Sequence, residues 1–323
     1  MQIYRFNSIL KPVLWGGDAM AAFKGLPPCD EPIGESWELS GVAGRETVVA
    51  EGPDKGLTLT QLVQRHGAKL VGEDVYRRFG TQFPLLIKFI DARRDLSVQV
   101  HPSDDLAMKQ HGCEGKTEMW YILRADEDAK VFTGFNRPMS PEEYDSRVGD
   151  GSILDVVTAT ISHPHDVFFI PNGQIHSIGA GNMLVEIQQS SDITYRVWDY
   201  GRRDADGNLR QLHTLQAREA LNYYVVDSVV HYGPVAASGV TPVVTCPKFD
   251  VRRIDVDGSL ELPLPSPHSF VALVCIEGEV TVAVEGMDSV TLRMGQTALV
   301  PAIASSIAFT GTARLLTAMV PEE

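Results

Sequence analysis

Residues 96–102 read Leu-Ser-Val-Gln-Val-His-Pro and combine strand-like alternation with two side chains that can bind a metal. Side chains alternate between the two faces of a strand, so Gln99 and His101 share one face and the apolar residues share the other. Pro102 is expected to end the strand, because proline cannot donate a hydrogen bond to the ladder. The Gln-x-His pair therefore predicts half of a metal site, and the rest of the chain must supply the other half.

Two further residues on predicted strands complete a plausible ligand set. Glu118 lies in the strand expected at 116–123, and His176 lies in the segment 174–179. Two imidazoles and one carboxylate suit Zn²⁺, Fe²⁺ or Mn²⁺, and the Gln99 oxygen is a weaker fourth ligand. Three strong ligands leave a position open, as in catalytic zinc sites. From the residues alone, the alternative is a set of ordinary hydrogen-bonded or solvated side chains, which is how we interpret the other seven histidines.

Three positively charged residues stand out near these segments. Lys88 interrupts the apolar run 82–90, where a lysine is rarely buried without a partner. Lys116 lies two residues before Glu118 on the same strand face, so it would place a cation beside the metal. Arg196 lies between aromatic residues, which suits a stacked, bidentate anion binder. Arg202 is more ordinarily interpreted as a solvated loop residue.

The elements that must position these residues are mostly strands. We expect strands at 82–90, 96–101, 116–123, 166–170, 174–179 and 183–188. Helical segments are expected at about 57–80, 103–112 and 140–160. From residue 240 to the end the pattern is all-β, and residues 295–301 match 165–171 without a gap, with Ser306 where His176 stands. We therefore expect a mainly β protein with helical insertions, divided into domains 1–239 and 240–323. The two domains would be similar β-barrels, the second degenerate and metal-free.

Bulk properties narrow the class of partner. The net charge of −14 over 323 residues argues against nucleic acid and anionic membranes, but a local cationic cluster could still bind a small phosphorylated substrate. The N-terminal residues lack the pattern of a signal peptide, and no apolar run is long enough to span a membrane. Four cysteines at unrelated spacings make a disulfide scaffold improbable. A cytoplasmic location is expected.

Several of these segments together resemble a known family. The segments are residues 85–88, 96–102, 115–121, 171–176 and 195–200, and the match runs in order from Trp15 to about Leu212. They resemble the short bacterial class of type I mannose-6-phosphate isomerases, which belongs to the cupin superfamily. The resemblance implies a cupin-type jelly-roll barrel and interconversion of mannose 6-phosphate and fructose 6-phosphate.

The resemblance also assigns roles to individual residues. One zinc ion per chain would be held by Gln99, His101, Glu118 and His176. Arg196 matches a position regarded as catalytic, and the pocket would be lined by Lys88, Ser97, Lys116 and Glu186. Two departures stand out: His165 replaces the usual glycine, and Arg202 replaces the lysine of longer relatives.

The implied chemistry is aldose–ketose exchange through a cis-enediol intermediate. This reaction needs a base and groups that stabilise charge developing on oxygen. Arg196 and Lys116 would supply positive charge, while Glu186 and a metal-bound hydroxide are alternative bases. Lys88, Ser97 and Arg202 are expected to face the phosphate.

Two other functions remain open at this point. A non-catalytic sugar-binding cupin could hold a structural metal, and an iron dioxygenase could use the same ligand types. The expected partner is a small phosphorylated hexose, and the chain could act as a monomer or a homodimer.

Overall fold

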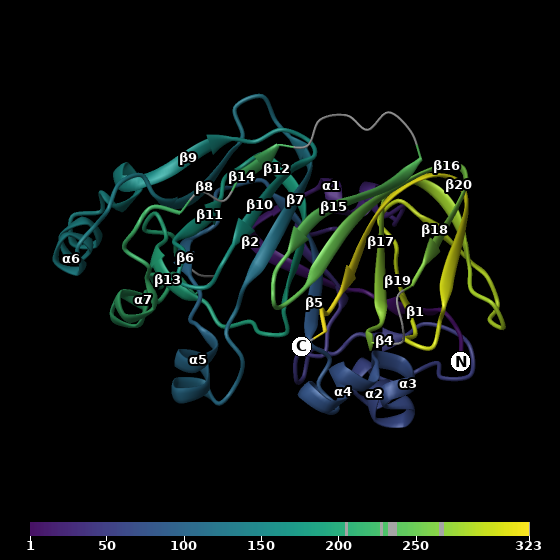
Figure 1. The fold of residues 1–323 in the computed structure, drawn as a ribbon. Helices are drawn as coiled ribbons and strands as arrows, with labels where there is room; N and C mark the ends of the chain where they lie inside the picture. The colour runs from purple at the N-terminus through teal and green to yellow at the C-terminus, as the bar shows by residue number, and fades with distance from the viewer. Residues whose placement is uncertain (204–205, 227–228, 232–237, 265–267, 323) are drawn as a thin grey trace.

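The computed structural model describes residues 1–203, 206–226, 229–231, 238–264 and 268–322. This part of the chain forms three sheets, with short helices at their margins (Figure 1). The strand pairs are antiparallel throughout the described residues. The expectation of a mainly β protein with few helices is confirmed.

Strand order defines the three sheets, which we call the central, outer and C-terminal sheets. The central sheet runs β14 (Val229–His231), β10 (Asp166–Ile170), β7 (Glu118–Ala125), β12 (Asn182–Gln189), β5 (Leu85–Ala92), β2 (Ile9–Gly17) and β3 (Ile33–Leu39), with β3 also pairing with β5. The outer sheet runs β13 (Tyr195–Trp198), β6 (Val98–Val100), β11 (His176–Ile178), β8 (Lys130–Phe135) and β9 (Val157–Ile161). The C-terminal sheet runs β15 (Gly239–Thr245), β16 (Asp250–Pro263), β20 (Ser306–Met319), β17 (Val271–Ala283), β19 (Thr297–Val300), β1 (Tyr4–Asn7) and β4 (Val48–Val49), and β18 (Val290–Arg293) pairs with β17.

The central sheet is covered on both faces. Every residue of β5 and β12 is buried. On β5, Ile87 and Phe89 belong to a hydrophobic core shared with the C-terminal sheet, whereas Ile90 and Ala92 belong to a core shared with the outer sheet. Burial on both faces explains the unbroken apolar run in this segment. It also means that Lys88 projects from its strand into the interior.

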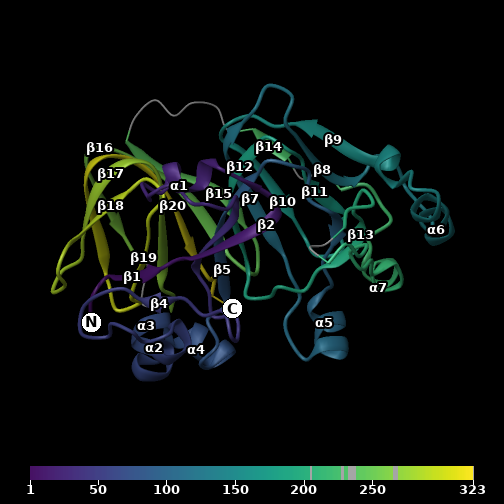
Figure 2. The same cartoon turned by 180° about the vertical axis from the view of Figure 1, so that it is seen from behind.

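The N-terminal strands cross from one sheet to another. β1 pairs with β19 through Tyr4 and Leu299, and β4 pairs with β1 through Val49 and Phe6. The chain then continues through β2 into the central sheet (Figure 2). The first residues of the chain thus complete the C-terminal sheet, which folds over a hydrophobic core of its own.

The first two predicted helical segments form helices. The segment 57–80 is three short helices, α2 (Leu59–His66), α3 (Ala68–Val71) and α4 (Glu73–Phe79), because Gly67 and Gly72 adopt positive φ angles of 52° and 97° between them. The capping box of Thr58 and Gln61 is present. The segment 103–112 is α5 (Asp104–His111), capped by the Ser103 hydroxyl.

The third predicted helix is shorter than expected. Helix α6 (Pro141–Gly149) begins at the Ser140 cap but does not reach residue 160. Two glycines at 149 and 151 end it, and Gly151 has φ of 79°. A 3₁₀ turn, η1 (Ile153–Val156), and strand β9 follow, in a segment rich in β-branched residues.

Two helices were not expected from the sequence. They are α1 (Ala19–Phe23) and α7 (Thr214–Ala220). In both views, helices α2 to α4 lie next to β1 and β4, while α6 and α7 lie beside the outer sheet, on the side of the molecule away from the C-terminal sheet (Figures 1 and 2). Among the described residues, no helix has the length and apolar character needed to cross a membrane.

A buried ion pair between Lys24 and Glu38 connects β3 with the C-terminal sheet. The Lys24 Nζ atom lies 2.5 Å from Glu38 Oε1 and donates to the Gly295 carbonyl at 2.9 Å. The two charged side chains are only 6% and 5% exposed. Burial raises the pKa of Glu38, although Lys24 opposes that shift. The pair therefore joins the first segment of the chain to the segment that precedes β19.

Replacement of Lys24 is expected to destabilise the protein strongly. Lys24→Met leaves the Glu38 carboxylate buried without its cation, and breaking a buried pair in this way costs about 3–5 kcal/mol. The free energy of unfolding in urea measures the loss.

The double variant Lys24→Met/Glu38→Met is the matched control. It removes both charges, so most of the stability should return. A loss below about 1 kcal/mol in the single variant, the value typical of exposed pairs, would contradict this role.

Candidate metal centre and active site

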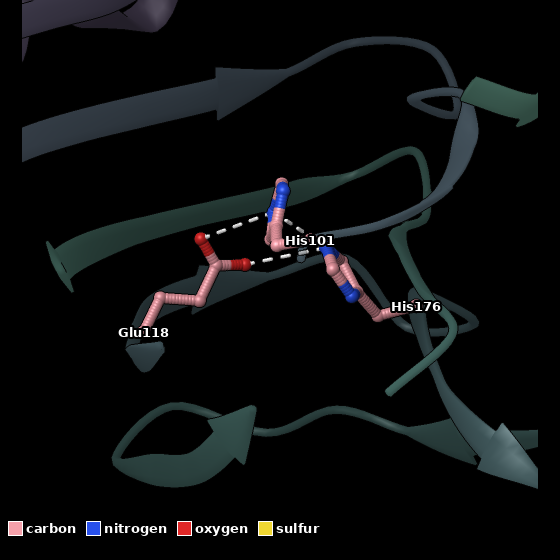
Figure 3. Close-up of side chains that lie close together, drawn as sticks. All are labelled: His101, Glu118 and His176. Carbon is pink, nitrogen blue, oxygen red and sulfur yellow. Dashed lines mark hydrogen bonds and ion pairs between the residues drawn. The ribbon is translucent and has the colours of Figure 1, made fainter. Parts of the chain in front are cut away.

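Three buried side chains meet between the central and outer sheets (Figure 3). Glu118 begins β7, His176 begins β11, and His101 directly follows β6. His176 Nε2 lies 3.1 Å from His101 Nε2 and 3.3 Å from Glu118 Oε1, and His101 Nε2 lies 3.6 Å from Glu118 Oε2. All three residues are at most 1% exposed. The structure thus brings together three of the four predicted metal ligands.

Hydrogen bonds to the main chain orient both imidazoles. His101 Nδ1 lies 2.8 Å from the Ile193 carbonyl, and His176 Nδ1 lies 2.8 Å from the Gln174 carbonyl. A carbonyl can only accept, so each Nδ1 carries the proton and each Nε2 presents a lone pair to the cluster. Burial lowers the pKa of His101, and it lowers the pKa of His176 to about 3.

This donor set fits a divalent cation. Two imidazole lone pairs and a carboxylate face one another, and Lys116 Nζ lies beside them, 2.6 Å from Glu118 Oε2 and 3.2 Å from His101 Nε2. Both oxygens of Glu118 are buried, and Oε1 has no hydrogen-bond donor among the described residues, whereas Oε2 is paired with Lys116. Histidine and carboxylate ligands of this kind suit zinc.

Gln99 is placed on the same face of the outer sheet. It lies opposite His176 on β11 and opposite Arg196 on β13. Residues directly opposite each other in antiparallel strands project from the same face. This position is compatible with the predicted fourth ligand. Ser97, just before β6, is also buried, at 6% exposed.

Alternating charges extend from the metal ligands across the central sheet. Lys116 Nζ lies 2.6 Å from Glu118 Oε2 and 3.6 Å from Glu186 Oε1. Lys88 Nζ lies 2.7 Å from the same Glu186 oxygen. The other Glu186 oxygen accepts a hydrogen bond from Trp120 Nε1 at 3.1 Å. The sequence-predicted residues Lys88, Lys116 and Glu186 therefore form one connected group beside the ligands.

Strand β3 supplies the outer end of this group, which the sequence analysis missed. Trp37 lies opposite Lys88, whose Nζ is 5.2 Å from the indole ring. Trp37 Nε1 donates to Glu35 Oε2 at 2.6 Å, and Lys11 Nζ lies 3.3 Å from the same oxygen. The only sequence signal was the Glu-x-Trp spacing on one strand face. We call the set Lys11, Glu35, Lys88, Glu186, Lys116 and Glu118 the charge row.

The pKa shifts indicate that Glu118 and Glu35 stay ionised. Burial alone would raise the pKa of Glu118, but Lys116 and His101 hold it well below its usual value. Burial would likewise raise the pKa of Glu35, but Lys88 and Lys11 lower it. The pKa of Lys116 is raised by the neighbouring carboxylates despite its burial.

The two predicted arginines occupy different surroundings. Arg196 is half-buried, and its Nη1 donates to the Gln211 carbonyl at 2.8 Å. Its buried Nε has no hydrogen-bond partner among the described residues. Arg202 forms an ion pair with Asp199 and donates to the Asp95 carbonyl at 2.5 Å. Arg196 thus retains a free donor, whereas Arg202 is engaged by its own loop and by Asp95.

Comparisons with known proteins agree with this site. The family described as phosphomannose isomerase type I, catalytic domain, matches residues 3–130, and the mannose-6-phosphate isomerase cupin domain matches residues 240–320. The chain is similar to mannose-6-phosphate isomerase ManA of Bacillus subtilis, at 36% identity over 277 residues, or 85% of each chain. It is also similar to the mannose-6-phosphate isomerase of Streptococcus mutans, at 33% identity over 304 residues, which covers 94% of this chain and 93% of that one.

A solved structure shows the same likeness in three dimensions. The crystal structure of the mannose 6-phosphate isomerase from Bacillus subtilis superimposes with a TM-score of 0.88 at 30% sequence identity, and the match covers 98% of this chain and 99% of that chain. The resemblance seen in the sequence motifs is confirmed by relatives that match nearly the full length. The chain belongs to the type I phosphomannose isomerase family.

Proposed function

We propose that this protein is a zinc-dependent isomerase that interconverts mannose 6-phosphate and fructose 6-phosphate through a cis-enediol intermediate. The observation that carries the proposal is the buried group of His101, Glu118 and His176, directly joined to Lys116 and Glu186. Relatives named as mannose-6-phosphate isomerases support the substrate and the reaction. One zinc ion per chain would be held by the three buried ligands, with Gln99 as the fourth.

The fold proposal goes with this assignment. We infer two cupin-type barrels, in domains 1–239 and 240–323, with the metal only in the first. The candidate ligand group found among the described residues lies in the first domain. A cytoplasmic location and a monomer or homodimer complete the proposal.

The chain's own residues would divide the work of proton transfer. Glu186 is our candidate base for the proton that moves between C2 and C1, because its carboxylate is oriented by Lys88 and the Trp120 indole. Lys116 and Arg196 would stabilise the negative charge that develops on the enediolate oxygens. Bound zinc would act as a Lewis acid toward the sugar oxygens.

The phosphate would lie toward the outer end of the charge row. Lys88, in this row, and Ser97, just before β6, are both buried, at 7% and 6% exposed. Arg202 remains the third predicted phosphate residue, but it would first have to release Asp199. Phosphate recognition is therefore expected to depend more on Lys88 and Ser97 than on Arg202.

Removal of the metal is expected to abolish isomerase activity. Chelation takes away the Lewis acid that the three ligand groups would hold beside the sugar oxygens. A coupled assay for fructose 6-phosphate, run before chelation, after it and after zinc is restored, measures the effect.

Each outcome of this assay separates the candidate functions. Activity that returns with zinc supports the isomerase. A folded, zinc-loaded protein without activity would favour the non-catalytic sugar-binding cupin, and iron-dependent oxygen uptake would favour a dioxygenase. Activity that resists thorough chelation would contradict a catalytic role for the metal.

Glu186→Gln is expected to lower kcat by about 10²–10⁴-fold, the usual contribution of a general base. Hydrogen exchange between the sugar and deuterated water should fall in parallel, since both need the same proton transfer. Exposed Glu261, on β16, offers Glu261→Gln as a matched control.

Arg196→Ala tests charge stabilisation rather than proton abstraction. We expect kcat to fall by about 10²–10³-fold, the loss typical of one charge-stabilising donor. The bound metal, measured by elemental analysis, should stay unchanged. Near-normal turnover in Arg196→Ala would remove this residue from the chemistry.

A further inference from the structure

The segment that leads into β7 carries Lys116, yet it lies outside the central sheet. The pairing of β7 with β12 ends at Glu118, which lies opposite Gln188, and residues 115–117 belong to no strand. A group that stabilises charge or holds a metal must be fixed to within about 0.5 Å. Contacts other than the sheet ladder must therefore hold this segment in place.

The side chain of Gln189 extends the pairing by one residue. Its Oε1 accepts a hydrogen bond from the Thr117 N–H at 2.9 Å, and the Gln189 main-chain N–H donates to the Thr117 carbonyl at 3.1 Å. Gln189 is only 2% exposed. The side-chain oxygen thus replaces one of the two hydrogen bonds of a regular antiparallel pair. It fixes the main chain of the residue between Lys116 and Glu118.

The Asp104 carboxylate holds both this side chain and the segment itself. Its Oδ1 atom accepts hydrogen bonds from Gln189 Nε2 and from the Gly115 N–H, both at 2.9 Å. Asp104 is the first residue of α5, the helix that follows the segment of His101. The carboxylate therefore ties the chain before β7 to the chain after β6.

The same two stretches of chain also touch through their main-chain atoms. The Lys116 N–H donates to the Pro102 carbonyl at 3.2 Å. A Cβ atom at position 115 would lie 2.6 Å from both the Pro102 oxygen and the Asp104 nitrogen, so only glycine fits there without displacing the main chain. Because Pro102 directly follows His101, the positions of His101 and Lys116 are coupled.

A lysine of the C-terminal sheet completes the contacts of Asp104. Lys248, in the loop between β15 and β16, places its Nζ atom 2.5 Å from Asp104 Oδ2. Burial would raise the pKa of Asp104, but Lys248 and Gln189 lower it. The Lys248 and Asp104 side chains are 29% and 40% exposed, and an ion pair of this kind contributes little stability by itself. The hydrogen bonds at Oδ1 are therefore the main consequence of the carboxylate.

We propose that Asp104 is a positioning residue for Lys116 and Glu118, and that it acts through Gly115 and Gln189. The proposal rests on the proposed function, because it concerns how the residues of that site are held. Loss of the carboxylate would leave the Gly115 N–H and the Gln189 amide without their shared acceptor, so the segment would be free to shift. Residues that orient metal ligands through hydrogen bonds alter metal affinity without touching the metal.

Asp104→Ala is expected to weaken zinc affinity by about 10–100-fold, the usual effect of removing a group that orients metal ligands. Competition with a chromogenic chelator measures the affinity. Asp105→Ala is the matched control, because Asp105 also lies in the first turn of α5 but is exposed. Equal zinc affinities in the two variants would overturn the proposal.

Turnover at saturating zinc gives a second readout. In Asp104→Ala, kcat for mannose 6-phosphate should fall by up to about 100-fold, because Lys116 is displaced from the developing charge. KM should change less than about threefold, since this charge develops only in the transition state. Gln189→Met removes the link to Thr117 and should reproduce both losses, which keeps the test decisive if Asp104→Ala does not fold. Wild-type zinc affinity and kcat in Gln189→Met would contradict the positioning role.

Double variants separate the hydrogen bonds of Asp104 from its ion pair with Lys248. Asp104→Asn/Lys248→Met removes both charges but keeps an oxygen acceptor, so zinc affinity should stay within about threefold of the wild type. Asp104→Ala/Lys248→Met should show the full loss. Equal losses in the two double variants would show that only the ion pair to the C-terminal sheet matters, and would overturn the proposal.

The zinc measurement also separates this proposal from the isomerase function. It needs no turnover, so weaker zinc affinity in Asp104→Ala than in Asp105→Ala would support the positioning role even in a protein without isomerase activity. An active wild type whose Asp104→Ala variant binds zinc and turns over normally would keep the isomerase function and overturn the positioning role. A wild type that binds no zinc would overturn both.

Discussion

The pairing of buried charges is the constraint on which the site depends. An isolated ammonium or carboxylate in a protein interior costs several kcal/mol, so the charge row can be buried only because its charges alternate. Lys116 lies between Glu118 and Glu186. Lys88 pairs with Glu186, and its charge also lowers the pKa of Glu35. These contacts need neighbouring strands in fixed register and a sheet covered on both faces. The packing of the central sheet between two others meets both needs.

The candidate metal ligands could be found one by one from the sequence, because each is a chemically capable side chain on or beside a predicted strand. The Gln-x-His spacing places Gln99 and His101 on one face without knowledge of any other strand. Glu118 and His176 each begin a strand and were found as chemically capable side chains near strand ends. Their meeting in space was not a consequence of spacing, and here the family resemblance supplied what the pattern lacked. Capped helices were equally local, and α2 and α5 begin at the residues that the capping signals indicate.

Features set by long-range pairing could not be predicted in this way. Trp37 and Glu35 join the site because β3 pairs with β5, over fifty residues further along the chain. No local pattern shows that register. The pairing of β1 with β19 joins the two ends of the chain for the same reason. The end of α6 was misjudged for a different reason, since the glycines at 149 and 151 and the β-branched residues after them outweigh the helical start.

His165 shows how a departure from a family pattern can be accommodated. Its φ angle is 74°, in the region that glycine adopts freely and that costs other residues roughly 1–2 kcal/mol. This backbone requirement explains why the family usually has glycine at the position. The imidazole offsets the cost by contacts that glycine could not make: its Nδ1 lies 3.1 Å from the Tyr121 hydroxyl and its Nε2 lies 3.4 Å from Arg314 Nη1. Tyr121 belongs to the central sheet and Arg314 to the C-terminal sheet. The histidine therefore strains its own backbone but adds side-chain contacts between the two sheets.

The same pairing that permits burial of the charge row also limits what the row can do for a substrate. Three lysines balanced by three carboxylates leave no net charge to attract a phosphate dianion, and the chain as a whole carries a charge of −14. In the proposed function, the excess positive charge must come from groups whose charge is not cancelled in the interior. A metal ion held by His101, Glu118 and His176 would meet that requirement at the inner end of the row. A bound sugar phosphate would then lie along a row of groups that are oriented but neutral overall, so that the row can serve proton transfer while the metal ion would supply positive charge.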